Sequence, residues 1–315
     1  MAEISFDKQI NSTNIEQHGD QTARINRPRK PVPVGKILIY ALLILGAVVA
    51  VIPFIWMLSW SMMTNVEVTR GLFVPTTGIH LQENYSIAWN NSGFSQYMWN
   101  SARIAAITLS GMLLCCIPAA YAFARMRFFG KNVLFAIMLL TLMIPDIVTL
   151  IPNFLTVVWI DRLSRSLFGD ATAWLNSWPA LTVPFMASAF VIFLLRQFFM
   201  QIPEDLWDAA RIDGAGHVRF MVSVVMPLSR PAITTVVLLG FIGSWNALLW
   251  PLLVVQTDTW RPVAYGLTLF VTGEAGDEFH LQMAASMIMI LPILVAYFFA
   301  QKQFTEGIAT TGSKG

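Results

Sequence analysis

The residues of this chain that could carry out catalysis are few and widely separated. The four histidines lie in different segments, and none is paired with another at the spacing that zinc ligands use. Ser, His and Asp, or Cys and His, do not occur in a grouping that favours nucleophilic catalysis. A phosphate-binding loop is not expected, since Gly35-Lys36 and Gly130-Lys131 lack both the upstream glycine and the following hydroxyl residue. The sequence therefore predicts a protein that is not an enzyme and itself binds no metal or cofactor.

A few polar and aromatic residues within apolar segments could instead contact a transported solute. Asp146 lies next to Pro145, roughly 20 Å into one segment at 1.5 Å per residue. A carboxyl at that depth is costly in a membrane and is a functional candidate by default. An alternative of equal weight is that Asp146 has a structural role, either paired with a neighbouring helix or lying near the outer interface. Aromatic and amide side chains can stack on a hydroxylated solute or form hydrogen bonds with it, although such residues more often serve in packing within helix bundles. The remaining candidates of this kind are Asn153, Trp245, Asn246 and Trp250.

The composition indicates that these residues are positioned in a membrane. Of the 315 residues, 56% are hydrophobic and 12% are charged, whereas a soluble domain carries about a quarter charged residues. Much of the surface must therefore face lipid. The formal net charge of +2, without basic residues clustered on one face, argues against a nucleic-acid partner. Cys115 and Cys116 are neighbours and rarely bridge without strain, so we expect them to pack as small apolar residues.

Six segments are long and apolar enough to cross a bilayer, which takes about 17 to 25 residues. Each is predicted to be a helix because a backbone in lipid has to satisfy its own hydrogen bonds. Prolines or glycines occur inside the third, fifth and sixth, which favours a bundle with a solute path over a simple anchor. The expected fold is an all-α integral membrane protein with six transmembrane helices, at 37–60, 104–124, 133–158, 178–199, 233–255 and 282–300.

The distribution of Lys and Arg predicts the orientation, because basic loops tend to stay in the cytosol. Basic residues are concentrated in the N-terminal tail, in the loop around Arg127 and in loop 201–231, so both termini are predicted to be cytosolic. Residues 1–33 are expected to form a disordered tail, with a regulatory or lipid-headgroup role as the alternative. Residues 34–304 then form the transmembrane domain, and 305–315 form a second cytosolic tail.

The loop between the fourth and fifth spans has the pattern of two short helices joined by a turn. The first helix is predicted over 204–212, because Pro203 suits the first helical position and acidic residues follow in the first turn. Gly214 and Gly216 permit the sharp turn that ends it. A second helix is predicted over 217–226, stopped by the prolines that follow.

The first of these helices is predicted to dock on another protein. Ala209 and Ala210 allow another backbone to come close, and Asp208 lies beside them. Trp207 is a large, mostly rigid anchor, and tryptophan is strongly enriched at binding hot spots. The alternative is an amphipathic loop that folds back on its own bundle or lies on the membrane surface.

The same loop resembles the EAA motif of binding-protein-dependent ABC importer permeases. That motif runs Glu-Ala-Ala, three residues, Gly, nine residues and Ile-x-Leu-Pro. Here the order is Asp208-Ala209-Ala210, three residues, Gly214, nine residues and Val224-Val225-Met226-Pro227, so every departure is conservative. The runs 195–199, 209–215, 245–252 and 304–315 also resemble the six-span permease subunit of carbohydrate importers of the maltose-transporter type.

The resemblance implies that the chain forms the membrane channel of an ATP-driven importer of an oligosaccharide or disaccharide, in a bacterial or archaeal plasma membrane. A second homologous permease subunit would pair with it, and two ATP-binding subunits would use ATP and magnesium. An extracytoplasmic solute-binding protein would deliver the sugar and meet loop 256–281. The helix 204–212 would be the coupling helix docked on one ATPase. The implied ATPase contacts are Glu204, Leu206, Trp207, Asp208, Ala209, Ala210, Asp213 and Gly214, with Gly312, Lys314 and Gly315 in the C-terminal tail.

Two other functions stay open. The motif identifies the partner rather than the cargo, so a permease for another solute, such as glycerol phosphate, a polyol or an amino sugar, fits the same residues. A secondary transporter that works without ATP is the alternative of a different class, and such proteins usually show internal repeats and intramembrane coupling charges. Here Asp146 is the only acid within a predicted span, and no clear repeat relates the two halves.

Overall fold

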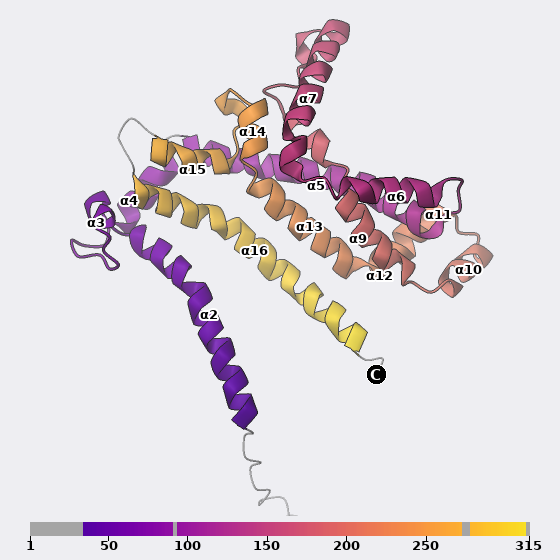
Figure 1. Ribbon diagram of the computed structural model, residues 1–315, viewed down its shortest axis with the longest axis horizontal. Coiled ribbons are helices and arrows are strands. Elements are labelled where there is room, and N and C mark those ends of the chain that lie inside the picture. The colour runs from indigo at the N-terminus through magenta and orange to yellow at the C-terminus, as the bar shows by residue number, and fades with distance from the viewer. Residues whose placement is uncertain (1–33, 91–92, 273–277, 313–315) are drawn as a thin grey trace, which may run out of the picture. The chain divides into compact units, whose positions relative to one another are not determined.

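The computed structural model describes residues 34–90, 93–272 and 278–312, and in these ranges all regular structure is helical (Figure 1). The all-α prediction is therefore confirmed. The chain divides into two compact units, residues 1–54 and 55–315. Within the described residues, four helices are long and apolar enough to cross a bilayer, and two bent pairs of helices bring the number to as many as six.

The first expected span is observed as α2 (Val34–Trp60), which confirms the prediction of 37–60. Its apolar side chains are exposed along most of its length, and none of its most apolar window is buried within the protein. A helix that is apolar on all sides is suited to lipid rather than to water.

The second span is a longer helix than predicted. α5 (Phe94–Arg125) has 32 residues, about 48 Å at 1.5 Å per residue, and begins ahead of the apolar segment 104–124. One face of α5 packs against α9 (Ala189–Met200) and α13 (Arg230–Trp245), and the buried side chains between them form the main core.

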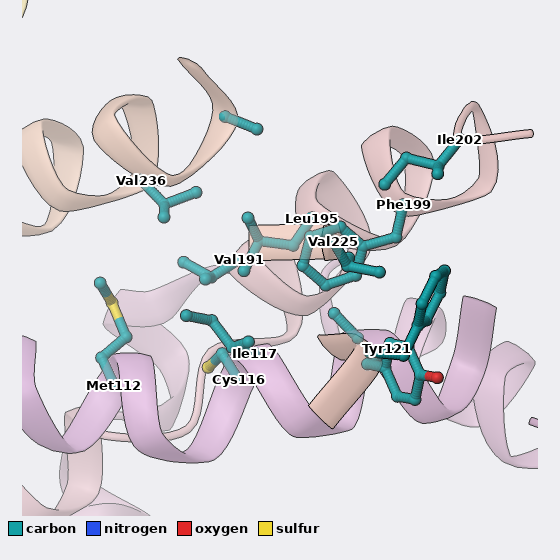
Figure 2. Close-up of a cluster of buried hydrophobic side chains, with 13 residues drawn as sticks. Met112, Cys116, Ile117, Tyr121, Val191, Leu195, Phe199, Ile202, Val225 and Val236 are labelled. Atoms are coloured by element: carbon teal, nitrogen blue, oxygen red, sulfur yellow. The ribbon is translucent and has the colours of Figure 1, made fainter. Parts of the chain in front are cut away.

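Small and apolar side chains fill the contact between α5 and α9. Figure 2 shows Met112 and Cys116 of α5 facing Val191 and Leu195 of α9. Cys116 is buried and Cys115 is exposed, and neither is in a disulfide. Cys116 therefore packs as a small apolar residue, as predicted, whereas Cys115 does not pack in the core.

The third span, predicted over 133–158, is two separate helices. α6 (Lys131–Thr141) ends before Pro145, and α7 (Asp146–Phe168) begins directly after it (Figure 1). Pro145 has extended backbone angles (φ −60°, ψ 135°), and it lacks the N–H that would continue a helical ladder. α7 then runs beyond the predicted end of the span and stops at Gly169, which has a φ of 85°.

The fourth and fifth spans are also broken. α8 (Trp178–Thr182), with the 3-10 turn that follows it, meets α9 at an angle of 41°. α13 ends at Trp245, and α14 (Leu249–Val254) follows after a short break, so the prediction of one helix over 233–255 was wrong. Pro251 has no N–H to donate to the carbonyl one helical turn before it, which explains why one continuous helix does not form across this segment.

The last span is one continuous helix, α16 (Phe279–Gly312), which contains Pro292 and extends well past residue 300. It packs against α13, α4 (Leu81–Asn90) and α15 (Val263–Thr272). The segment predicted as a C-terminal tail from residue 305 is helical as far as Gly312.

A buried carboxylate that sequence analysis did not single out organises the segment after α2. Glu67, in the short helix α3 (Asn65–Thr69), accepts hydrogen bonds from the backbone N–H and the hydroxyl of Thr76 at 2.6 and 2.7 Å. The backbone N–H groups of Thr64 and Thr77 donate to the same carboxylate at 3.0 and 2.8 Å. These donors, with the Thr76 hydroxyl first, hold the pKa of Glu67 well below its ordinary value.

Glu67→Gln is expected to lower the melting temperature at pH 7, because an amide NH2 group cannot accept the hydrogen bonds that one carboxylate oxygen receives. The folded pKa of Glu67 is lowered, so the carboxylate's stabilising effect is complete above the ordinary Glu pKa of about 4.3. That effect is lost as the pH falls through the lowered pKa, and the difference between variant and wild type should therefore close in strong acid. Glu83→Gln, at a carboxyl whose side chain is 67% exposed, is the control and should melt like the wild type. Wild-type melting of Glu67→Gln at pH 7 would contradict this role.

Candidate functional site

The first loop helix is observed where it was predicted. α10 (Asp205–Ile212) starts after Glu204, its N-cap residue, and carries Asp205 and Asp208 in its first turn. Carboxylates at this end of a helix complement the helix dipole. The prediction of a helix over 204–212 is confirmed.

A left-handed glycine ends α10. Gly214 has a φ of 74°, and its N–H donates to the carbonyl of Arg211 at 3.0 Å. The N–H of Ala215 donates to the carbonyl of Ala210 at 2.8 Å, which completes a Schellman motif. Gly216 has an ordinary φ of −83°, so only the first of the two predicted glycines is needed for its backbone freedom.

The second loop helix continues further than predicted. α11 (His217–Phe220), a π-helical turn (Met221–Val225) and α12 (Met226–Leu228) follow one another directly, so Pro227 does not stop the helix. Proline is tolerated at this position because it follows the π-helical turn, where the ordinary hydrogen-bond ladder is already interrupted. The chain then bends by 81° at Ser229 into α13.

Trp207 attaches α10 to the rest of the protein. Its ring stacks on His217 with centroids 4.4 Å apart and an interplanar angle of 15°, and it meets Phe220 edge-on at 5.0 Å. His217 Nδ1 is 2.9 Å from the hydroxyl of Tyr121, which lies on α5. Trp207 is half-buried against its own chain, so much of its surface is already used inside the subunit.

The base of the loop is fixed to the C-terminal end of α5. Arg125 Nε donates to the carbonyl of Phe199 at 3.1 Å, and the same guanidinium donates to the carbonyl of Ile202. Arg196 Nε donates to the carbonyl of Phe123 at 3.1 Å. Phe199 and Ile202 are buried in the same core cluster as Tyr121 (Figure 2). α10 therefore follows a segment that is held at several points.

The remaining predicted contact residues lie mostly on the surface. Ala210 is half-buried, and the others are exposed: Glu204, Leu206, Asp208, Ala209, Asp213 and Gly214. Sequence analysis did not single out Ile212 and Val218, which are 87% and 73% exposed on either side of the turn. Their sequence positions, as large apolar residues on either side of the predicted turn, could have indicated them as docking residues. Together these residues form an exposed surface, acidic and apolar, that is suited to docking.

The two tryptophans proposed for solute contact are buried in different places. Trp245 Nε1 donates to the carbonyl of Met289 on α16 at 3.1 Å. Trp250 Nε1 donates to the carbonyl of Ala180 on α8 at 2.8 Å. The structure does not bring the two rings together, since they belong to separate clusters of the core. Both hold neighbouring helices, and their contact with a solute stays a prediction.

The polar candidates for the solute path are all exposed. Asp146 is the first residue of α7 rather than a residue in the middle of a helix, because the chain breaks at Pro145. Asn153 lies on α7, and Asn246 lies at the C-terminal end of α13. Among the residues that the structure describes, no three His, Cys, Asp or Glu side chains are grouped so as to hold a metal ion.

A polar cluster at the N-terminal end of α5 was not predicted. Asn100 donates to the backbone carbonyl of Arg261 at 2.9 Å and accepts a hydrogen bond from Arg103. The Arg103 guanidinium lies 4.7 Å from the ring centre of Trp260, and Arg261 forms an ion pair with Asp258. The partners Asn100 and Arg261 are 161 positions apart, so no local pattern could have indicated the cluster.

Several predicted residues lie outside the described part of the chain. Lys314 and Gly315 are among them, and Gly312 is the last residue of α16. The N-terminal tail 1–33 and residues 273–277 of the predicted outer loop are also outside it. The roles given to these residues stay predictions.

Comparison with known proteins places the chain among transport proteins. Residues 113–309 match the family described as "Binding-protein-dependent transport system inner membrane component". The chain is 30% identical over 287 residues to the sn-glycerol-3-phosphate transport system permease protein UgpE of Brucella abortus (strain 2308), with 89% of this chain and 98% of the relative covered. It is 31% identical over 276 residues to the protein of that name from Pectobacterium atrosepticum, covering 85% of this chain and 94% of the relative.

Solved structures show the same fold. A chain of a bacterial ABC transporter involved in the import of the acidic polysaccharide alginate superposes with a TM-score of 0.73 at 24% identity, covering 89% of this chain and 99% of that one. A chain of a bacterial alginate ABC transporter in complex with a periplasmic protein bound to an alginate pentasaccharide gives a TM-score of 0.56 at 16% identity, covering 84% and 92%.

Proposed function

This chain belongs to the family of binding-protein-dependent transport system inner membrane components and is a permease subunit of an ABC importer, and on that premise we propose that α10 is the helix through which partner ATPase subunits drive transport. The protein is an integral component of the inner membrane. Its own role is to form the path for the solute, and ATP and Mg²⁺ are used by the partner subunits.

One observation carries this proposal: α10 offers an exposed face while its base is fixed. Ala209 is exposed and small, so another backbone can approach closely, and Leu206 adds apolar surface beside it. The exposed carboxylates of Glu204 and Asp208 suit basic groups on a partner. A helix held by Trp207 can transmit a displacement to the core, whereas a loose loop would absorb it.

The proposed assembly contains two permeases, two ATP-binding subunits and a solute-binding protein. The end of α5 near Arg125 would face the cytosol and the ATPases, which fits the basic residues gathered there. The cluster of Asn100, Arg103 and Arg261 would then lie at the outer end, towards the binding protein. The exposed apolar side chains of α6 and α7 would face lipid or the second permease.

We propose a carbohydrate, in the form of an oligosaccharide or disaccharide, as the solute. The exposed polar residues Asp146, Asn153 and Asn246 would supply hydrogen-bonding groups along its path. A phosphorylated polyol is the second candidate, favoured by relatives named as sn-glycerol-3-phosphate permeases. Trp245 and Trp250 would act by holding helices rather than by stacking on the solute, because both side chains are buried, at 3% and 7% exposure.

Uptake by the complete assembly in proteoliposomes is expected to require ATP, Mg²⁺ and the solute-binding protein together. Labelled disaccharide should accumulate inside, and this chain purified alone should not hydrolyse ATP. Accumulation of sn-glycerol 3-phosphate in place of the disaccharide would select the second candidate. Uptake driven by an ion gradient without ATP would instead indicate a secondary transporter and overturn the proposal.

A further inference from the structure

Four basic side chains gather where α5 ends and α6 begins. Arg125, Arg127 and Lys131 lie on the connecting turn, which we call the basic turn (residues 125–131), and Arg196 lies on α9 beside it. The ion pairs of the described residues include none of these four side chains. The positive charge at this end of α5 is therefore not neutralised by a carboxylate within the described part of the chain.

The bonds that these cations do form are to backbone carbonyls. Lys131 Nζ donates to the carbonyl of Met126 at 3.0 Å, and Arg125 and Arg196 donate to carbonyls at the ends of α9 and α5. Arg127 is exposed and makes no hydrogen bond or ion pair with the described residues. Arg127 and Arg196 lie close enough to Lys131 for their positive charges to act on its ammonium group. Helix capping thus accounts for three of the four cations but leaves Arg127 without a partner among the described residues.

Exposed aromatic and apolar groups adjoin this charge. Phe129, at the tip of the basic turn, is fully exposed, and Phe128 is 40% exposed. The apolar surface continues along α6, where Val133, Leu134 and Ile137 are each more than half exposed. A phenylalanine at the start of an apolar helix, next to uncompensated cations, has the arrangement found where a protein meets the headgroup layer of a membrane.

We propose that the basic turn binds the phosphate of an anionic phospholipid, with Phe129 inserted beside the acyl chains. Arg127 contacts the phosphate, and the exposed face of α6 continues the contact into the hydrocarbon. A free phosphate ion offers the same charge but does not cover Phe129 or the face of α6, and for this reason the lipid is the ligand. This inference requires only that the chain lies in a membrane, and it does not depend on the solute or on the docking of α10.

The test is lipid enrichment around the complete importer. The assembly is placed in nanodiscs of phosphatidylcholine containing a minor share of phosphatidylglycerol, and native mass spectrometry measures the phosphatidylglycerol that stays bound. Arg127→Gln is expected to lower its enrichment about fivefold, since a cation near an anionic lipid surface contributes about 1 kcal/mol. Phe129→Ser is expected to lower it as well. Arg162→Gln is the matched control, because Arg162 is an exposed cation on α7 that also forms no ion pair within the described ranges.

Each alternative to lipid binding by the basic turn predicts a different experimental result. Unchanged enrichment in Arg127→Gln would overturn the proposal, and so would an equal loss in Arg162→Gln. Displacement of the bound lipid by millimolar inorganic phosphate would indicate a general anion site instead. Loss of a partner subunit from Arg127→Gln in pure phosphatidylcholine would show that the basic turn contacts protein. Arg127 makes no hydrogen bond or ion pair with the residues that the structure describes, so a melting temperature in detergent equal to that of the wild type is expected.

Discussion

Gly214→Val is expected to reduce ATP-driven uptake about tenfold or more while the protein still inserts into the membrane. A β-branched residue is strongly disfavoured at the φ of 74° that Gly214 adopts. Strain of about 1 to 3 kcal/mol would be relieved by opening the turn, which breaks the hydrogen bonds from Gly214 and Ala215 back to α10. α10 would then lose its fixed direction, and ATP hydrolysis by the partners would no longer move the core.

Gly216→Val is the matched control for this experiment. No atom outside the local chain lies within 4 Å of the position that a Cβ would take at either glycine, so both variants place the same side chain in open space. Of these two glycines, only Gly214 has a left-handed backbone conformation. Uptake should therefore stay near the wild-type rate in Gly216→Val. Equal uptake by the two variants in proteoliposomes would mean that coupling does not depend on the geometry of this turn.

Trp207→Ala is expected to separate ATP hydrolysis from uptake, because α10 loses its attachment to the core. The variant removes the stacking on His217 at 4.4 Å and the edge contact with Phe220 at 5.0 Å. Removal of a fully buried tryptophan costs about 3 to 5 kcal/mol, and the loss is smaller here because the ring is half-buried. Hydrogen exchange at the amides of α10 should become faster, and uptake per ATP hydrolysed should fall several-fold.

Leu206→Ala distinguishes attachment from docking. Leu206 is the neighbouring residue on α10 and is 41% exposed, so its truncation removes apolar docking surface without loosening the helix. This variant should bind the ATPase subunits more weakly while the exchange of α10 amides stays unchanged. Trp207→Phe keeps an aromatic ring against His217 and should restore part of the uptake. If Trp207→Ala leaves amide exchange unchanged and weakens ATPase binding instead, the ring contacts the partner directly, as the sequence first indicated.

The sequence predicted the membrane class and the loop helix well because both depend on local chemistry. A long apolar segment such as α2 needs only its own composition to favour lipid, and its bounds followed the hydropathy. α10 was equally local, since acidic residues begin it and Gly214 ends it within one short stretch of chain. The same local reasoning failed at Pro145, where hydropathy continued across a break in the helix. Hydropathy measures the preference of side chains for lipid and does not report whether the backbone stays helical.

The sequence alone determined that the chain is a helical membrane protein. It also determined that one loop contains a helix that begins with acidic residues and ends at a glycine. Composition and the residues adjacent in the chain decide both features. Only the tertiary structure decided which way the side chains face. The ring of Trp207 packs on His217 of its own chain, and its predicted contact with a partner stays a prediction. Trp245 is bonded to α16. Glu67 and Arg127 look alike in sequence as single charged residues, but Glu67 is buried among donors, whereas Arg127 makes no ion pair or hydrogen bond with the described residues. Such differences arise from contacts between segments far apart in the chain, and the free energy of those contacts depends on the packing of whole helices rather than on any local pattern.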